Sequence, residues 1–254
     1  MTAVPAARPG PLAALSAVYA GQLSRAKAAR GPLLFVATLQ SLGILLLLRG
    51  VVHGDGARTS SAIVAGSTVL VVAFVALNLL AQRFGALKAA RALDYYGALP
   101  IGAAPVVLGT AASYATFTLP GAVLTCVVGV ALYGLPFAQM WVVLPVVLAA
   151  GVALAGLGAA IGLLAPRAEL ATVAGQLAMT AVLFLGVIPP AHLPGALRAL
   201  RSLVPSMTAV DALAAALRGT PSWWGVVWRL AVSVAWGVVG LAVASRAFRR
   251  ARER

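Results

Sequence analysis

Long apolar runs, separated by short segments rich in charge, glycine or proline, make up most of the chain. A helix that crosses a bilayer needs about 20 consecutive, mostly apolar residues. The pattern predicts six such helices, near residues 33–52, 61–81, 102–132, 137–164, 170–188 and 223–244. We therefore expect an all-α integral membrane protein, a six-transmembrane-helix bundle that forms a single domain over residues 1–254.

The boundary between the third and fourth helices rests on a turn signal. No Asp, Glu, Lys, Arg or His occurs between Tyr95 and Pro166, and this stretch is too long for one crossing. The sequence Tyr133-Gly134-Leu135-Pro136 is typical of a turn, so we expect it to divide the stretch in two.

Residues 1–31 precede the first predicted crossing. Apolar residues recur there at helical spacing, ahead of several basic residues; they are Leu12, Leu15, Tyr19, Leu23 and Ala26. This pattern predicts an amphipathic helix at the membrane surface. A basic tail without fixed structure is the alternative. Residues 245–254 are predicted to form a second basic tail.

The composition supports a lipid environment. Apolar residues make up 62% of the chain and charged residues 9%, with a mean hydropathy of +1.00. Soluble domains carry about a quarter charged residues. A soluble chain of this length has too little interior to bury so much apolar surface.

The basic residues predict the orientation in the membrane. Thirteen Lys and Arg residues flank the predicted crossings on the side of both termini, and five lie on the other side. Positive charge concentrates in cytoplasmic loops. We therefore expect a multi-pass protein of the cell membrane with both termini in the cytoplasm. The net charge of +14 fits this orientation and anionic headgroups better than nucleic acid.

The sequence contains few groups suited to catalysis. It has no P-loop motif, no zincin helix and no G-x-S-x-G motif. The single cysteine, Cys126, and the two histidines, His53 and His192, lie far apart in the sequence, so we expect no catalytic residue and no metal site. None of the five acidic residues falls in the middle of a predicted crossing, which argues against a chain driven by an ion gradient.

The segment between the second and third crossings, residues 83–100, is the most informative loop. Phe84, Leu87, Arg91 and Asp94 recur at helical spacing before Gly97 and Pro100. This predicts an amphipathic helix along the membrane surface that docks into a groove on a cytoplasmic partner. A simple connector in the headgroup layer is the alternative. We call residues 83–100 the coupling segment.

The loop before the last crossing is rich in proline and leucine. Pro189, Pro190 and Pro194 end the fifth crossing, and a short amphipathic helix is expected before Pro205. A further apolar helix is predicted at residues 207–217. An apolar helix outside the membrane is costly unless it re-enters the membrane or caps the bundle.

Two patterns within the predicted crossings indicate either close packing of helices or a path for substrate. Thr172, Gln176 and Thr180 form one stripe of the fifth helix; they could line a substrate path between two copies or bond between helices. Gly158 and Gly162 form a G-x-x-x-G motif in the fourth helix. Close packing within the chain is the favoured interpretation of this motif, and a dimer seam is the alternative.

Two regions resemble the membrane permease subunit of ABC-2 type transporters, the exporters that include the daunorubicin and polysaccharide systems. In the segment Leu93-Asp94-Tyr95-Tyr96-Gly97-Ala98-Leu99-Pro100, an acidic residue opens a short helix that ends in Leu-Pro. The second region is the outer loop, where Pro189-Pro190 is followed by Leu193-Pro194, Leu203-Val204-Pro205 and Asp211-Ala212-Leu213.

The resemblance implies a function and a set of site residues. The chain would be a permease subunit rather than an enzyme, paired with a second copy or a related permease. Separate ATPase subunits would bind ATP and Mg²⁺, and this chain would bind no cofactor. The implied ATPase-coupling residues are Arg83, Leu87, Lys88, Arg91, Asp94, Tyr95 and Tyr96. The implied outer-loop motif is Pro189, Pro190, Pro194 and Pro205.

Two other classes of function remain open from the residues alone. A membrane enzyme acting on lipids would need clustered acids, histidines or a nucleophile at one membrane face. An assembly or scaffold protein would need no transport path. Isolating the protein with its partners would separate these classes from an exporter.

Overall fold

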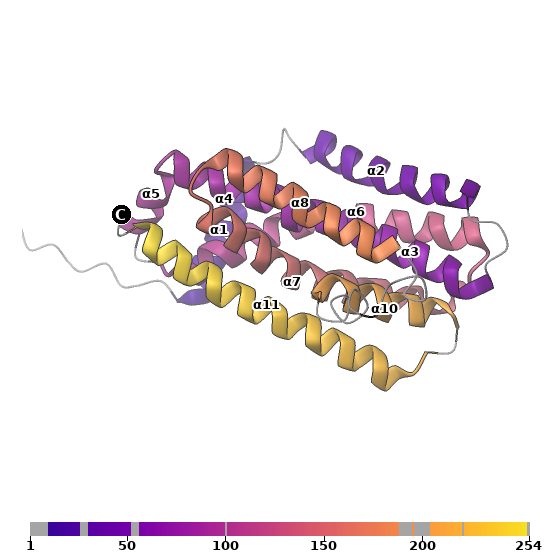
Figure 1. Ribbon diagram of the computed structural model, residues 1–254. Helices are drawn as coiled ribbons and strands as arrows, with labels where there is room; N and C mark the ends of the chain where they lie inside the picture. Colours follow the sequence, from indigo (N-terminus) through magenta and orange to yellow (C-terminus); the bar gives the residue numbers. More distant parts are fainter. Residues whose placement is uncertain are drawn as a thin grey trace, which may run out of the picture.

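The computed structural model describes residues 10–25, 30–51, 56–99, 101–187, 195, 204–219 and 221–252, and all regular structure within them is helical (Figure 1). The elements follow one another as α1 (Pro11–Arg25), α2 (Arg30–Val51), α3 (Gly56–Ala73), η1 (Phe74–Leu79), α4 (Leu80–Ala89), α5 (Ala92–Ala98), α6 (Ala103–Tyr133), η2 (Phe137–Val142), α7 (Val143–Leu164), α8 (Ala168–Val187), α10 (Pro205–Leu217) and α11 (Trp223–Arg252).

The long helices lie roughly along one axis (Figure 1). Among the described residues, five continuous helical stretches are long and apolar enough to cross a membrane: Gly56–Ala89, Ala103–Tyr133, Phe137–Leu164, Ala168–Leu185 and Trp223–Ala251. Helix α2 adds a shorter apolar stretch, Phe35–Gly50. The predicted integral membrane helical bundle is thus confirmed, whereas a count of six crossings is not.

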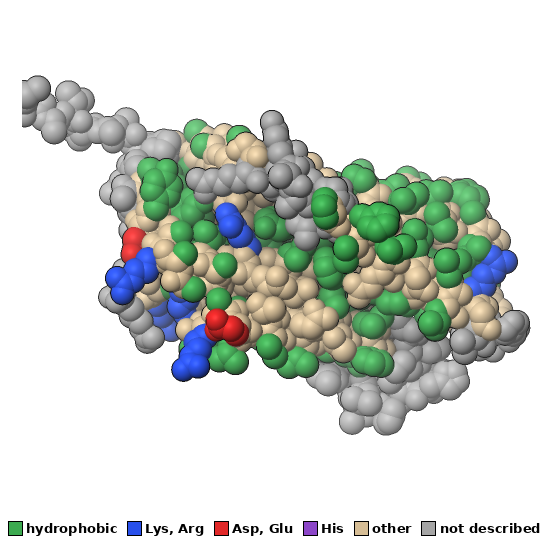
Figure 2. Space-filling model, turned by 90° about the horizontal axis from the view of Figure 1, so that it is seen from above, with side chains coloured by type: hydrophobic (Ala, Val, Ile, Leu, Met, Phe, Trp, Pro, Cys, Tyr) green, Lys and Arg blue, Asp and Glu red, His purple; other side chains and the backbone are tan. Residues whose placement is uncertain are grey.

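The bundle has two distinct ends, which we call the α5 end and the α10 end. Helix α5 and the C-terminal turns of α11 lie at one end, and α10 lies toward the other (Figure 1). Exposed Arg91, Arg249 and Arg250 belong to the α5 end. On the face in Figure 2, charged side chains lie toward the ends and hydrophobic side chains cover much of the surface between them.

The second crossing is longer than the sequence pattern predicts. It runs without interruption from Gly56 to Ala89 and passes through the π-helical turn η1. The expected boundary near residue 81 is wrong because Phe84 and Leu87, at 0% and 6% exposure, are part of the bundle core. Gly85 lets α4 approach α8 closely, since an added Cβ there would lie 2.6 Å from the Cβ of Ala171.

Small residues let α7 pack tightly on two neighbours. A Cβ on Gly158 would overlap the carbonyl oxygen of Ala76, and one on Gly162 would lie 2.5 Å from the carbonyl oxygen of Ala81. A Cβ on Gly156 would lie 2.9 Å from the backbone nitrogen of Leu241 in α11. The G-x-x-x-G motif therefore serves close packing within the chain, as the favoured interpretation predicted.

Helix α10, predicted at residues 207–217, is present and lies inside the bundle. It begins at Pro205, where a missing N–H costs nothing in the first helical turn. Its described residues are nearly all buried, and it packs against α3, α7 and α11. Thr208 and Ser233 join α10 to α11 by a hydrogen bond of 2.7 Å between their hydroxyl oxygens. Because α10 is buried against other helices, it does not carry the free-energy cost expected of an apolar helix exposed outside the membrane.

The expected N-terminal helix is present as α1 and packs across α6. Its buried stripe consists of Ala14, Val18 and Gln22, whereas Leu12, predicted for the apolar face, is 80% exposed. At the other terminus α11 continues as one helix through Arg252, and Phe248 is buried at 1% exposure. The first part of the predicted basic tail is therefore a continuation of the last crossing.

Candidate functional site

The coupling segment is two helices joined by a sharp turn, not one amphipathic helix. Helix α4 ends at Ala89, and Arg91 adopts the left-handed conformation with φ 52° and ψ 19°. Helix α5 then starts at Ala92, and the Asp94 N–H donates to the Arg91 carbonyl at 3.1 Å. Among the described non-glycine residues, Arg91 alone has a positive φ. The expectation of one continuous helix through 84, 87, 91 and 94 is wrong because this turn redirects the chain.

Helix α5 has an inward and an outward side. Leu93 and Tyr96 are buried at 2% and 7% exposure. Asp94 is exposed and Tyr95 is 61% exposed, with its ring edge-on to that of Tyr96 at a centroid distance of 5.6 Å. An exposed tyrosine on an anchored helix is a suitable protein-contact group, because its ring offers a large rigid area at low entropic cost.

A polar network holds the inward side of α5. Gln22 of α1 donates its side-chain N–H to the hydroxyl of Tyr96 at 2.9 Å. The guanidinium of Arg83, on α4, donates to the side-chain oxygen of Gln22 at 3.3 Å. Tyr19 and Thr116 then connect α1 to α6 through hydroxyl oxygens 3.0 Å apart. Through these hydrogen bonds, α1 is connected to the end of the second crossing, to α5 and to α6.

Lys88 caps a neighbouring helix. Its ammonium group donates to the backbone carbonyls of Leu163 at 3.0 Å and Ala165 at 2.8 Å, at the C-terminal end of α7. A cation satisfies the otherwise unpaired carbonyls and the negative end of the helix dipole. Lys88 therefore has a structural partner inside the chain.

The seven residues predicted for ATPase coupling fall into two groups. Arg91, Asp94 and Tyr95 lie on the outer surface of the α5 end. The other four belong to the bundle, through burial or hydrogen bonds to other helices; they are Arg83, Leu87, Lys88 and Tyr96. Of the seven, only Arg91, Asp94 and Tyr95 are fully in the exposed class, so they are best placed to contact another protein.

Further basic side chains are exposed at the α5 end of the bundle (Figure 1). Arg167 is exposed between α7 and α8, and Arg246, Arg249 and Arg250 are exposed on the last turns of α11. Glu169 is an exposed acidic residue of the same region. The exposed charge of the α5 end is therefore predominantly positive, which suits an acidic protein surface or anionic headgroups.

The predicted polar stripe of α8 faces away from the bundle. Thr172 and Gln176 are exposed and Thr180 is half-buried, whereas Ala171, Gly175 and Met179 on the opposite face are buried. The Thr172 hydroxyl donates to the Ala168 carbonyl at 3.2 Å, so its bond is local to the helix. This stripe is available to a second chain or to lipid.

Several predicted residues cannot be placed. Pro189, Pro190 and Pro194 of the outer-loop motif, and both histidines, lie outside the described residues. Pro205 is described, as the first residue of the buried helix α10. Among the described residues, no group of three or more His, Cys, Asp or Glu is placed to hold a metal ion.

Gln22 is a residue of the candidate site that the sequence pattern did not single out. It continues the stripe of Ala14 and Val18 at four-residue spacing, yet it is polar and only 4% exposed. A polar residue on the apolar face of an amphipathic helix indicates a buried hydrogen bond. That signal could have singled out Gln22, although not its partners.

Residues 54–246 match a family model described as ABC-2 family transporter protein. A comparison with curated proteins gave no match. The matched region covers most of the chain and includes the coupling segment, the α8 stripe, α10 and most of α11. The chain therefore belongs to the ABC-2 family of transporter proteins.

Proposed function

We propose that this chain is the permease subunit of an ATP-driven ABC-2 type exporter. Two copies, or this chain and a related permease, enclose the substrate path, and separate cytoplasmic ATPase subunits bind and hydrolyse ATP with Mg²⁺. The α5 end faces the cytoplasm and the protein resides in the cell membrane. The thirteen-to-five distribution of basic residues supports this orientation.

The observation that carries the proposal is the division of α5 into two sides. Tyr95, Asp94 and Arg91 face outward, where an ATPase groove can receive them. Tyr96 and Leu93 are held inside the bundle. Because the inward side is anchored, a push on α5 moves α4 and α1 with it instead of bending a free loop.

The network around Gln22 offers a route for that motion into the membrane. Hydrogen bonds connect Tyr96 to Gln22, and Gln22 to Arg83 on the second crossing. Through Tyr19 and Thr116 the network also reaches α6. Closure of the ATPase subunits on ATP would therefore displace two crossings together, which is a rigid-element mechanism of coupling.

The substrate path is proposed to run along the outward stripe of α8. Thr172 and Gln176 supply exposed polar groups, and half-buried Thr180 continues the same stripe. A second permease would place an equivalent stripe opposite. A path with few charges and largely apolar walls suits an amphipathic or lipid-like cargo.

The proposal is tested by copurifying the chain from its native membrane, identifying the recovered ATPase and measuring its ATP hydrolysis in nanodiscs. The double variant Arg91→Glu with Asp94→Arg exchanges two exposed charges beside Tyr95. It should lower the hydrolysis that depends on this chain while the amount of inserted protein stays unchanged. Tyr95→Ala should do the same through loss of contact area.

The control is Arg58→Glu, which reverses an exposed charge on α3 at the α10 end, away from α5 (Figure 1). This control should retain hydrolysis. Full activity of the α5 variants would refute the assignment of α5 as the coupling helix. Recovery of an ATPase without movement of a fluorescent phospholipid or another amphipathic probe across vesicles would favour an assembly role.

A further inference from the structure

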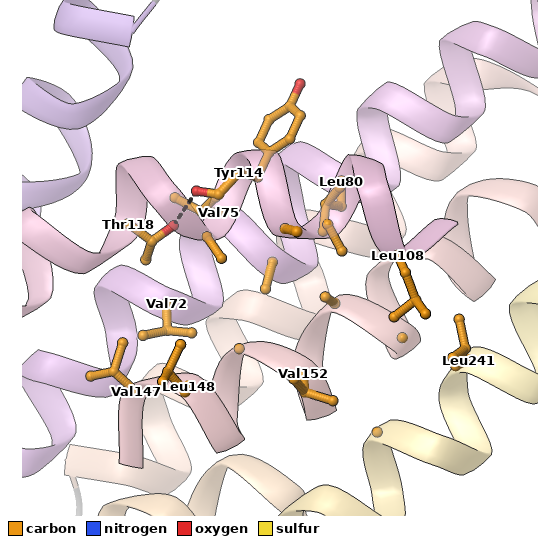
Figure 3. Close-up of a pocket in the computed structure, with 18 of the residues that line it drawn as sticks. Val72, Val75, Leu80, Leu108, Tyr114, Thr118, Val147, Leu148, Val152 and Leu241 are labelled. Atoms are coloured by element: carbon orange, nitrogen blue, oxygen red, sulfur yellow. Dashed lines mark hydrogen bonds between the residues drawn. The ribbon is translucent and has the colours of Figure 1, made fainter. Parts of the chain in front are cut away.

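A cavity of about 250 Å³ lies between η1, α6, α7 and α11, within the membrane-spanning part of the bundle. In Figure 3 the side chains of Val72, Val147 and Leu148 gather around one space, and the ring of Tyr114 points away from them. The coupling network and the α8 stripe contribute no residue to its lining. The cavity is therefore separate from the site described above.

Small residues create this space. Ala111 and Ala115 on α6 face Gly151 and Ala155 on α7 across the cavity. A Cβ added to Gly151 would meet only the Cγ1 of Val72, at 3.9 Å, so this glycine does not bring two helices together. Elsewhere on α7, glycines make close backbone contacts. At Gly151 the missing side chain leaves room instead.

The lining has almost no capacity to hold water. Among the described residues that line the cavity, only Thr118 and Tyr114 have polar side chains. The Thr118 hydroxyl already donates to the Tyr114 carbonyl at 2.9 Å (Figure 3). A water molecule needs two to four polar partners, and apolar cavities of roughly 150 Å³ stay dry and take up small hydrocarbons. The cavity is therefore suited to a hydrocarbon group.

The cavity opens sideways onto the lipid-facing surface. Its inner wall includes Val72 and Ala76, which are 1% and 5% exposed. Its rim includes Leu148, Val152 and Val238, which are 45%, 46% and 61% exposed on α7 and α11. In a membrane protein those rim residues contact lipid tails. The cavity is thus continuous with the interface between protein and bilayer.

We propose that this cavity is a binding site for one acyl chain of a membrane phospholipid, which enters laterally between the rim residues. The driving force is close packing: lipid tails are already apolar, so the chain gains contacts that an empty space cannot provide. The headgroup stays outside, because the cavity offers it no polar partner. This inference goes beyond the proposed export function and holds for the permease without its ATPase.

The test uses full-length protein in vesicles of phosphatidylglycerol and phosphatidylethanolamine. A small fraction of phosphatidylcholine carries a diazirine at the end of one acyl chain. After illumination, labelled peptides are identified by mass spectrometry. We expect peptides of α6 and α7 around Ala111 and Gly151 to be labelled more strongly than the exposed face of α2 around Leu39 and Leu46.

Gly151→Leu should fill the cavity, and Ala115→Leu is a second filling variant if the first does not fold. Labelling of Ala111 peptides should then fall about tenfold, the change that ~1.4 kcal/mol of lost binding produces. Ala235→Leu adds the same side chain to an exposed position of α11 that does not line the cavity. It should leave the labelling unchanged.

Equal labelling of the cavity and the exposed α2 face, with no effect of either filling variant, would overturn the proposal. A loss of labelling in the Ala235→Leu control as large as that in the filling variants would also overturn it. Because the vesicles contain no ATPase, neither result depends on whether the chain is an exporter subunit.

Discussion

The side-chain amide of Gln22 donates a hydrogen bond to the hydroxyl of Tyr96 at 2.9 Å, across 74 positions of the sequence. Both residues are buried, at 4% and 7% exposure. The bond fixes α5 to α1, and Arg83 extends it to the end of the second crossing. A helix of seven residues is too short to be stable alone, so this attachment keeps Tyr95 and Asp94 in a defined position.

Gln22→Leu should lower stability by about 1–3 kcal/mol, because the hydroxyl of Tyr96 and the guanidinium of Arg83 would lose a buried partner. Thermal unfolding of the purified protein in detergent measures the change. Ser16→Ala, on the exposed side of α1, is the control and should have little effect. In the double variant Gln22→Leu with Tyr96→Phe, the loss of stability should be smaller than the sum of the losses in the two single variants. An additive result would mean that the two side chains do not act together.

Lys88→Met should destabilise the chain by about 1–3 kcal/mol, because two carbonyls at the end of α7 would lose a charged donor. The same thermal assay measures the loss. Arg91→Met, which removes an equal charge from an exposed position, should leave stability nearly unchanged. If instead Lys88→Met preserved stability and weakened ATPase binding, Lys88 would be a contact residue and the capping assignment would be wrong.

Gly158→Ala should be among the most damaging single substitutions. The added Cβ would overlap the Ala76 carbonyl, and backbone on both helices would have to move. We expect a loss of more than about 3 kcal/mol, the upper range for overpacking, or failure to insert. Gly43→Ala on α2 is the matched control, since its Cβ meets nothing within 4 Å. The control should gain up to about 1 kcal/mol from helix propensity.

Arg91→Gly should maintain or raise stability by about 1 kcal/mol, because glycine adopts the left-handed conformation without the steric cost of a Cβ. Arg91→Val should lower stability by at least a similar amount, since a β-branched side chain is strained at positive φ. Unfolding midpoints of both variants, compared with Arg91→Met, separate backbone strain from loss of charge. Equal stability of the glycine and valine variants would contradict the turn geometry.

The sequence alone was sufficient for the membrane class and for most of the helices. Apolar runs near the length of a bilayer crossing, bounded by charge or by turns such as Tyr133-Gly134-Leu135-Pro136, predict α6, α7, α8 and α11 because lipid demands internally bonded helices. The helical spacing of apolar residues before the first crossing predicted α1, and a short apolar segment after Pro205 predicted α10. These features depend on local composition and length, which can be read along the chain.

The tertiary structure decided which faces of those helices meet. Phe84, Leu87 and Lys88 have the spacing of a surface helix, yet they belong to the bundle. An apolar stripe looks the same in sequence whether it lies against lipid or against another helix. The partners of Gln22, the overlap of Gly158 with Ala76 and the space beside Gly151 depend on distances between residues far apart in the sequence. Only the packed bundle determines those distances, because close packing acts between atoms and not along the chain.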